Sequence, residues 1–321
     1  MTSKNRRVIL TIAAGTAASL IITEWGNGAM KVGITVGVIV LLRVIQSIFG
    51  KQVSLYFPQT RCGRMKYLAI SMGLSAVLGL AVFALNADGA VTVPMLLISG
   101  TSGLALACCT VCGKLAMQSG TMALESVVAA ASVILPSVCG VLFWGEPMSA
   151  GQWIGIVLFL GSVLLMVQSS QRTNAGFSGR TLLLLLGTFL SNGAVMICQK
   201  LITYAAPGSS IALFSFFMFA IPALLCAGIA AGTAAGTTGE RLDRRLVLPI
   251  VLLAAAVFVI NQLATGATDT VPSVMLFAAL SASSSVIAAI VGAVGYGERL
   301  TVRSVCGIVL CVASLAMINL L

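Results

Sequence analysis

The sequence contains no histidine and very few charged residues. Without histidine, the chain lacks the side chain that most often serves as proton relay, general base or metal ligand. Only 8% of the 321 residues are charged, whereas soluble domains average roughly 25%. So few charges cannot solvate a globular surface of this size, which excludes an ordinary soluble enzyme.

Acidic and aromatic residues are scarce as well. The chain has 8 acidic residues against 18 basic ones, and aromatic residues make up 6%. A net charge of +10 indicates nucleic-acid binding only where the basic residues form one patch with aromatic platforms. Here they are scattered at the ends of apolar runs, so we expect no nucleic-acid partner and assign these charges to membrane orientation.

Motifs for catalysis and cofactor binding are missing too. The sequence contains no Gly-x-Ser-x-Gly, no dinucleotide fingerprint and no P-loop. The nine cysteines fall mostly within apolar runs, and "CCTVC" (Cys108 to Cys112) has no second pair to complete a zinc site. We therefore expect no catalytic residues, no cofactor and no metal, and we interpret the cysteines as small packing residues.

The chain is instead rich in long apolar runs, with 59% hydrophobic residues. A bilayer core about 30 Å thick needs about 20 mostly apolar residues for each helix that crosses it. The runs predict an all-α polytopic membrane protein. Its ten-helix core is expected near residues 30–50, 66–86, 94–115, 122–144, 152–169, 181–203, 209–232, 246–265, 271–294 and 302–321.

The basic residues predict how the core is oriented. Alternate loops carry Lys51, Arg61, Arg64, Lys66, Lys114, Arg172, Arg180, Arg241, Arg244, Arg245, Arg299 and Arg303. The opposite loops have only Lys31 and Lys200, and they hold Asp88, Glu146 and Asp269. By the positive-inside rule the first set is cytoplasmic, which places the C-terminus outside. We expect an integral protein of the plasma (inner) membrane.

One more apolar run, residues 8–23, lies within an N-terminal segment of residues 1–28. The basic "SKNRR" before this run and Glu24 after it fit an extra helix that crosses the membrane from the cytoplasm. The run is at the short limit for a span, and a cleaved signal peptide is the alternative. We favour a retained anchor.

The core has the pattern of an internal duplication. A Gly-Glu pair followed by a further glycine occurs twice at the same spacing, as Gly145, Glu146 and Gly155 and as Gly297, Glu298 and Gly307. In addition, "IFGKQVSLYFP" (48–58) aligns with "ICQKLITYAAP" (197–207). These matches predict two five-helix repeats, residues 29–172 and 173–321. Because five is odd, the second repeat inserts upside down, as in alternating-access transporters.

In this interpretation the repeated Gly-Glu pairs are structural. Each pair closes the fourth helix of its repeat at the membrane surface, where a carboxylate stays hydrated. The later glycine lies in the fifth helix and lets another backbone approach closely. The two glutamates lie on opposite faces of the membrane, so they cannot form a carboxylate pair for acid–base chemistry.

The two junctions resemble the EamA-type drug/metabolite transporter superfamily. They read "LFWGEPMSAGQWIGIVLFLGSVLLM" (142–166) and "VGYGERLTVRSVCGIVLCVASLAMINLL" (294–321), and the resemblance extends over about residues 29–321. It implies a ten-helix inverted-repeat fold and secondary transport, often export, of small metabolites or drugs. The last helix is also similar to that of the small multidrug resistance proteins. An external C-terminus departs from the family, whose members usually have both termini in the cytoplasm.

Polar side chains inside the predicted spans are candidates for a substrate site, because they are costly to place there. Arg43 is the clearest candidate, Gln46 lies on nearly the same helix face, and Asn192 occupies the matching position of the second repeat. A guanidinium grips a carboxylate or phosphate well. Alternatively, Arg43 snorkels to the cytoplasmic surface or pairs with Glu125.

Glu125 is the acidic residue placed inside a predicted span, and it is the candidate for proton coupling. The alternative is an interfacial residue paired with Arg43 or Lys114. Further substrate-binding candidates lie on the third helix of each repeat and on the ninth core helix: Thr110, Asn261, Gln262 and Ser284. Serine in a membrane helix also serves close packing, which is the other interpretation of Ser284.

These observations predict a secondary active transporter, most simply an exporter, of a small organic metabolite or drug by alternating access. Without a nucleotide-binding domain, transport must use a gradient of protons or another ion, or be passive. The expected partners are a small-molecule substrate and the lipid bilayer, and the protein is expected to act as a monomer or homodimer. A non-transporting scaffold or sensor subunit and an intramembrane enzyme are the alternative functions.

Overall fold

The structure is a computed structural model of the chain, and the part that it describes is helical. It describes residues 27–86, 91–119, 122–145, 148–173, 178–206, 208–234, 244–268, 273–297 and 301–320. The predicted anchor at residues 8–23 lies outside the described residues, as do Glu146 and Glu298.

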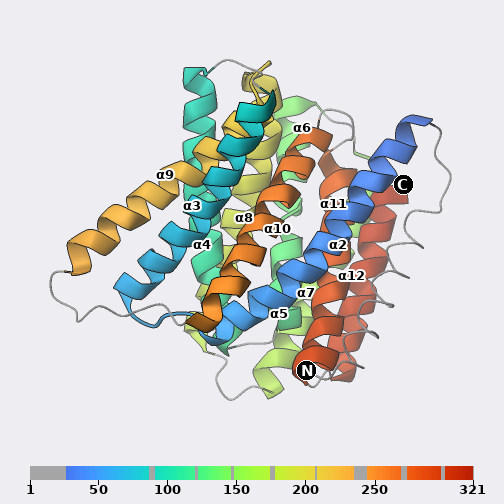
Figure 1. The fold of residues 1–321 in the computed structure, drawn as a ribbon. Coiled ribbons are helices and arrows are strands. Elements are labelled where there is room, and N and C mark those ends of the chain that lie inside the picture. Colours follow the sequence, from blue (N-terminus) through green and yellow to red (C-terminus); the bar gives the residue numbers. More distant parts are fainter. Residues whose placement is uncertain are drawn as a thin grey trace.

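The helices follow the predicted spans closely and in the same order (Figure 1). In the first half of the chain they are α2 (Asn27–Leu55), α3 (Arg61–Asn86), α4 (Val93–Ser119), α5 (Met122–Ala131), α6 (Ile134–Trp144) and α7 (Ala150–Thr173). In the second half they are α8 (Gly179–Ala205), α9 (Ile211–Ala234), η1 (Arg244–Leu246), α10 (Val247–Ala267), α11 (Ser273–Ile290), the π-helix η2 (Val291–Gly295) and α12 (Val302–Leu320).

The helices have the length and surface of membrane spans. Within the described residues, seven are long and apolar enough to cross a membrane, and α7, α12 and the α11–η2 segment contain shorter apolar stretches. Large apolar side chains face outward, such as Phe143 at 76% exposed and Leu183 at 71%. A soluble monomer does not expose apolar surface on this scale, so the chain is an all-α integral membrane protein.

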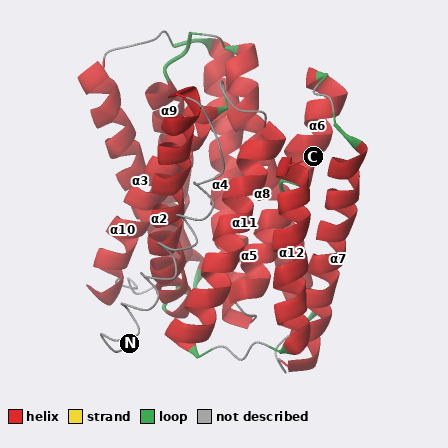
Figure 2. Ribbon diagram, turned by 90° about the vertical axis from the view of Figure 1, so that its right-hand side faces the viewer, coloured by secondary structure: helices red, strands yellow, loops and turns green. Residues whose placement is uncertain are grey.

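The packing joins helices from the two halves of the chain. The α3 helix packs chiefly against α9, α4 against α8, α2 against α10, and α7 against α12. The α5 helix packs against α11 and α8, and α11 also contacts α2. Figures 1 and 2 show the result as one bundle in which helices of the first and second halves are interleaved.

The two largest of four clusters of buried side chains in the described residues join many of these helices. The larger one lies mainly between α3 and α9 and contains Tyr67, Phe214 and Phe219, all at most 1% exposed. The other brings α5, α7, α8, α11 and α12 together around side chains such as Phe159 and Phe277. Residues of both clusters line the polar cavity described below.

The fourth predicted span is broken into α5 and α6. Pro136 causes the break, because proline has no N–H and its ring clashes with the carbonyl four residues earlier, that of Ser132. The backbone here forms hydrogen bonds to the third residue back instead of the fourth. The Ser132 N–H donates to Ala129 O at 3.3 Å, and the Leu135 N–H donates to Ser132 O at 3.1 Å. Carbonyl groups at the break are thereby opened to partners on other helices.

The two Gly-Glu junctions share one backbone conformation at their glycines. Gly145 has a φ of 62° and Gly297 a φ of 67°, the left-handed region that glycine adopts without strain after a helix. The Gly145 N–H donates to the carbonyl of Gly140 and closes α6. The later glycines, Gly155 and Gly307, are buried on α7 and α12, which pack against each other.

Candidate functional site: a polar cavity inside the bundle

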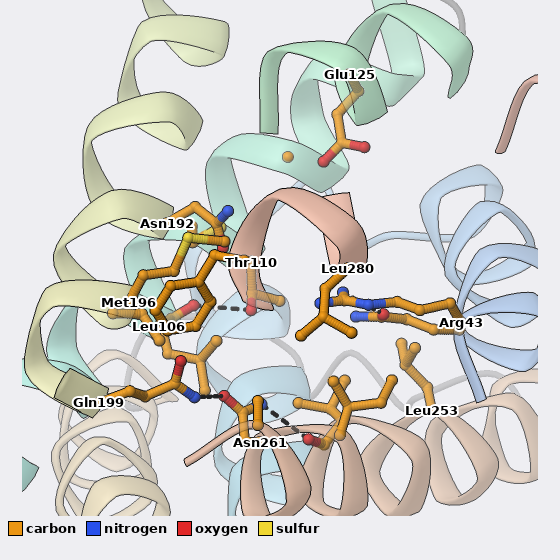
Figure 3. Close-up of a pocket in the computed structure, with 18 of the residues that line it drawn as sticks. Arg43, Leu106, Thr110, Glu125, Asn192, Met196, Gln199, Leu253, Asn261 and Leu280 are labelled. Carbon is orange, nitrogen blue, oxygen red and sulfur yellow. Dashed lines mark hydrogen bonds between the residues drawn. The ribbon is translucent and has the colours of Figure 1, made fainter. Parts of the chain in front are cut away.

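A cavity of about 160 Å³ lies within the bundle, lined by α2, α4, α5, α8, α10 and α11. It is polar on some walls and apolar on others (Figure 3). The polar and charged lining residues are Arg43, Gln46, Cys109, Thr110, Lys114, Glu125, Asn192, Gln199 and Asn261. The cavity therefore brings together six of the residues that the sequence predicted for a substrate or proton site.

Arg43 reaches into the cavity from α2, toward Thr110 and Leu280 (Figure 3). Its Nη1 donates to Oε1 of Gln46 at 2.8 Å, one turn along the same helix. Its Nε is buried and has no hydrogen-bond partner among the described residues. A buried donor without a partner is costly, so this edge of the guanidinium is ready to accept a ligand.

Glu125 faces the same cavity from the first turn of α5. Arg43 and Lys114 line the cavity with it, and Lys51 is a further cation in its surroundings. Among the described residues, Glu125 forms no ion pair within 4.0 Å with any of them. Glu125 thus shares the cavity with Arg43 and Lys114 without the direct ion pair that the sequence offered as an alternative.

Glycines make room for two of these charged side chains. A Cβ added at Gly113 would lie 2.7 Å from Oε1 of Glu125, and one at Gly50 would lie 3.0 Å from Nζ of Lys114. Each charged group thus rests against a backbone that has no side chain at the point of contact. A side chain at either position would require the charged group to shift.

Asn192 lines the cavity but also binds the broken span. Its Nδ2 donates to the carbonyl of Ala129 at 3.0 Å and to Oγ of Ser132 at 2.6 Å, both at the break between α5 and α6. The sequence identified Asn192 as a polar group at depth, but it did not reveal this bond. The amide nitrogen is occupied, which leaves the carbonyl oxygen as the group available to a ligand.

Gln199 and Asn261 form a second polar wall that sequence reasoning identified only in part. Nε2 of Gln199 donates to Oδ1 of Asn261 at 2.8 Å, and Nδ2 of Asn261 donates to the carbonyl of Val257 at 2.8 Å. Gln199 was missed because it precedes Lys200 near a predicted helix end. Lys114 was missed for the same reason, since loop charges and cavity charges look alike in sequence.

Of the remaining candidates, Thr110 lines the cavity, whereas Gln262 and Ser284 do not. Thr110 lines the cavity, and its hydroxyl donates to Leu106 O at 2.8 Å within its own helix. Gln262 is not among the lining residues, and its Oε1 accepts a hydrogen bond of 2.6 Å from Ser215. Ser284 also lies outside the lining, and it donates to Ser281 O at 2.9 Å, as a packing serine does.

The cavity is suited to binding a small molecule. Within the described part of the chain, no group of three or more Cys, Asp or Glu side chains could hold a metal ion. The lining offers a guanidinium, an ammonium, a carboxylate and four amides, together with apolar walls from side chains such as Leu253, Phe277 and Leu280. Such a mixture of apolar surface and few polar groups is typical of ligand sites.

Comparison with known proteins establishes the fold alone. A solved crystal structure of another protein is similar over 88% of this chain and 98% of its own length, with a TM-score of 0.63 and 13% sequence identity. No protein-family model matches the chain. No curated protein matches it either. The fold and the cavity thus define an all-α integral membrane protein with an internal polar site, and the resemblance to EamA-type transporters stays a prediction.

Proposed function

We propose that the protein is a secondary transporter that moves a small organic solute across the membrane by alternating access. The observation that carries this proposal is the polar cavity, which holds costly charged side chains among membrane-spanning helices. Charges at such positions are rare and mark substrate or ion pathways. A scaffold has no need of such charges.

Two inverted five-helix repeats are the architecture that we propose for this carrier. The packing supports it, because contacts between the halves are reciprocal: α4 packs against α8 as α10 packs against α2, and α5 contacts α8 as α11 contacts α2. Equivalent helices also pair with each other, as α3 with α9 and α7 with α12. Left-handed glycines at 145 and 297 mark equivalent junctions.

The position of the cavity supports the same mechanism. Its walls come from α2, α4 and α5 of the first proposed repeat and from α8, α10 and α11 of the second. Inverted-repeat carriers hold their substrate at the interface between the repeats, where rocking of one repeat against the other exposes the site to each side in turn. This architecture also fits the resemblance to the EamA-type superfamily, to which we propose that the chain is related.

Transport by the purified full-length protein in liposomes tests the proposal. A panel of amino acids, nucleosides, sugar nucleotides and small organic acids is first screened for thermal stabilisation of the protein. Flux of the compounds that stabilise it is then measured against empty liposomes. We expect saturable flux that Arg43→Ala reduces at least about tenfold, because a lost hydrogen bond to a charged group is worth about 1.5–3 kcal/mol.

Arg61→Ala is the matched control, because Arg61 is an exposed arginine at the start of α3 that does not line the cavity. This variant should transport as the unaltered protein does. Equal flux by both alanine variants would remove Arg43 from the site. Absence of flux for every stabilising compound, with intact protein in the liposomes, would contradict the carrier proposal itself.

A further inference from the structure

The charges around the cavity are unbalanced in favour of cations. Arg43 and Lys114 line it, and Glu125 is the one acidic side chain of the described lining. Uncompensated charge inside a membrane protein is costly. The excess of positive charge therefore attracts an anion to this site.

Arg43 presents a specific unused edge to such an anion. Nη1 is occupied by Gln46, whereas Nε is buried and has no partner among the residues that the structure describes, so the Nε side of the guanidinium is the side left for a ligand. Two parallel donors on one edge match the two oxygens of a carboxylate. In Figure 3 this end of Arg43 points into the cavity, between the level of Glu125 and that of the Gln199–Asn261 pair.

The walls favour an organic anion over an inorganic one. Leu106, Met196, Leu253, Phe277 and Leu280 line the cavity beside the polar groups. A volume of about 160 Å³ is available, close to the roughly 150 Å³ of an engineered cavity that binds benzene. An ion such as phosphate would leave these apolar walls without a contact, whereas a carboxylic acid with a short carbon chain or one ring would fill them.

The carboxylate of Glu125 lies where the cations of the cavity would also attract a bound anion. Its carboxylate is attracted by the same cations and rests against Gly113, with the hydroxyl of Thr188 on the same side of that glycine. No ion pair within 4.0 Å fixes it in place among the described residues. A second carboxylate beside it would be repelled, unless Glu125 loses its charge.

We infer that the transported solute is a small monocarboxylate, held by Arg43 and Lys114, and that Glu125 takes up one proton as the anion binds. This inference rests on the proposed transport function and names its substrate class and coupling. The carboxylate of Glu125 becomes a carboxylic acid, and the negative charge that it carried is replaced by that of the solute. The charge of the site is unchanged, so one proton and one anion move together without net charge.

The groups that face Glu125 from the helices around it are few. Lys114 and Cys109 face it from α4, and Arg43 and Lys51 from α2. Thr188 lies nearby on α8, and no described charged side chain of α7 or α11 acts on it. Among these groups, the thiol of Cys109 is the other one that could change its charge by exchanging a proton. A variant of Cys109 is therefore needed as a control.

Ligand binding by the purified full-length protein tests the inference directly. The probes are acetate, butyrate and benzoate, each compared with its own amide, and inorganic phosphate. We expect the carboxylates to raise the unfolding temperature, whereas the amides and phosphate leave it unchanged. If binding is linked to the uptake of one proton, the dissociation constant should fall by up to about tenfold for each unit by which the pH is lowered. This holds over the pH range in which Glu125 is ionised in the free protein.

Three variants separate the roles of the side chains. Glu125→Gln mimics the protonated acid, so it should bind the carboxylates tightly at every pH and lose the pH dependence. Arg43→Gln should abolish binding, whereas the exposed-site control Arg61→Gln should not change it. Cys109→Ser should keep the pH dependence. Lys114→Gln offers a second test of the anion site if Arg43→Gln does not fold.

The outcomes distinguish this inference from the transport proposal. Tight binding of amides, amines or phosphate in place of carboxylates would overturn the substrate class, even where those compounds are transported. A pH dependence that persists in Glu125→Gln, or that disappears in Cys109→Ser, would overturn the role of Glu125. Carboxylates that bind as expected without any flux in liposomes would leave the anion site standing and contradict transport.

Discussion

At Gly103 the backbone of α4 lies directly against α9. A Cβ added there would clash with the carbonyl of Met218 and lie 2.9 Å from Cδ of Pro222, neither of which can move aside alone. Small residues at helix interfaces in membranes allow this close approach, and van der Waals packing then holds the helices together. Gly100, one turn earlier, meets only the flexible end of Ile221 at 3.4 Å.

We therefore predict that Gly103→Ala and Gly100→Ala differ sharply. The first should destabilise the protein by about 1–3 kcal/mol, as overpacking of a tight interface does. The second should be neutral or slightly stabilising, since alanine is the better helix former. Thermal unfolding of both variants in the same detergent measures the difference. Equal unfolding temperatures would show that α4 and α9 are not in the contact described here.

Single residues also show where sequence reasoning succeeds and where it fails. Arg43 and Glu125 were recognisable because a charged side chain inside a membrane span has a high free-energy cost, which indicates a functional role. Lys114 and Gln199 line the same cavity but lie near predicted helix ends, where polar residues are ordinary. Asn261 and Gln262 are adjacent amides in the same apolar run, so the sequence cannot separate them. The orientation of α10 about its axis places Asn261, and not Gln262, on the cavity wall.

At the scale of a whole element, the break between α5 and α6 links the fold to the site. The sequence predicted one continuous span over residues 122–144, because its apolar run is uninterrupted. The structure breaks that span at Ser132, and Asn192 of α8 binds the exposed carbonyl of Ala129 and the hydroxyl of Ser132. Pro136 was visible in the sequence, but the partner of the break was not, since it depends on tertiary packing.

Asn192→Leu should therefore destabilise the broken span. The change removes two hydrogen bonds, and interhelical hydrogen bonds in membranes are worth about 0.6 kcal/mol on average and at most about 1.7. We expect a loss of about 1–2 kcal/mol, measured as a lower unfolding temperature. Gln59→Leu is the matched control, because Gln59 is an exposed amide with hydrogen bonds of 3.3 Å. A loss no larger than that of the control would contradict the role assigned to Asn192.

For the molecule as a whole, the span positions and their order could be predicted because runs of apolar residues directly reflect the bilayer. The arrangement of those spans could not, since membrane helices are apolar on most faces and their sequences do not say which face meets which neighbour. The long-range signals were the repeated junctions at Gly145 and Gly297 and the alignment of residues 48–58 with 197–207. The reciprocal packing of the two halves agrees with them, although it adds pairs, such as α3 with α9, that no sequence pattern specified.

Orientation in the membrane gives the last prediction. Basic residues lie at the ends of α2 and α3 that their loop joins, and between α9 and α10, whereas the C-terminal end of α12 lies at the opposite end of the bundle from the α2–α3 loop (Figure 1). Because basic loops stay in the cytoplasm, a cysteine added after Leu321 should react with a membrane-impermeant thiol reagent in intact cells.

The matched position is Gln59→Cys in the α2–α3 loop, studied like the first in a background in which the exposed Cys108 and Cys306 are replaced by alanine. This cysteine should be protected in intact cells and react only after permeabilisation. The two positions control each other, because an inverted protein would exchange their reactivities. Reaction of both positions from outside would show that one or more of the spans does not cross, and the proposed pairing of two oppositely oriented halves around one cavity would then fail.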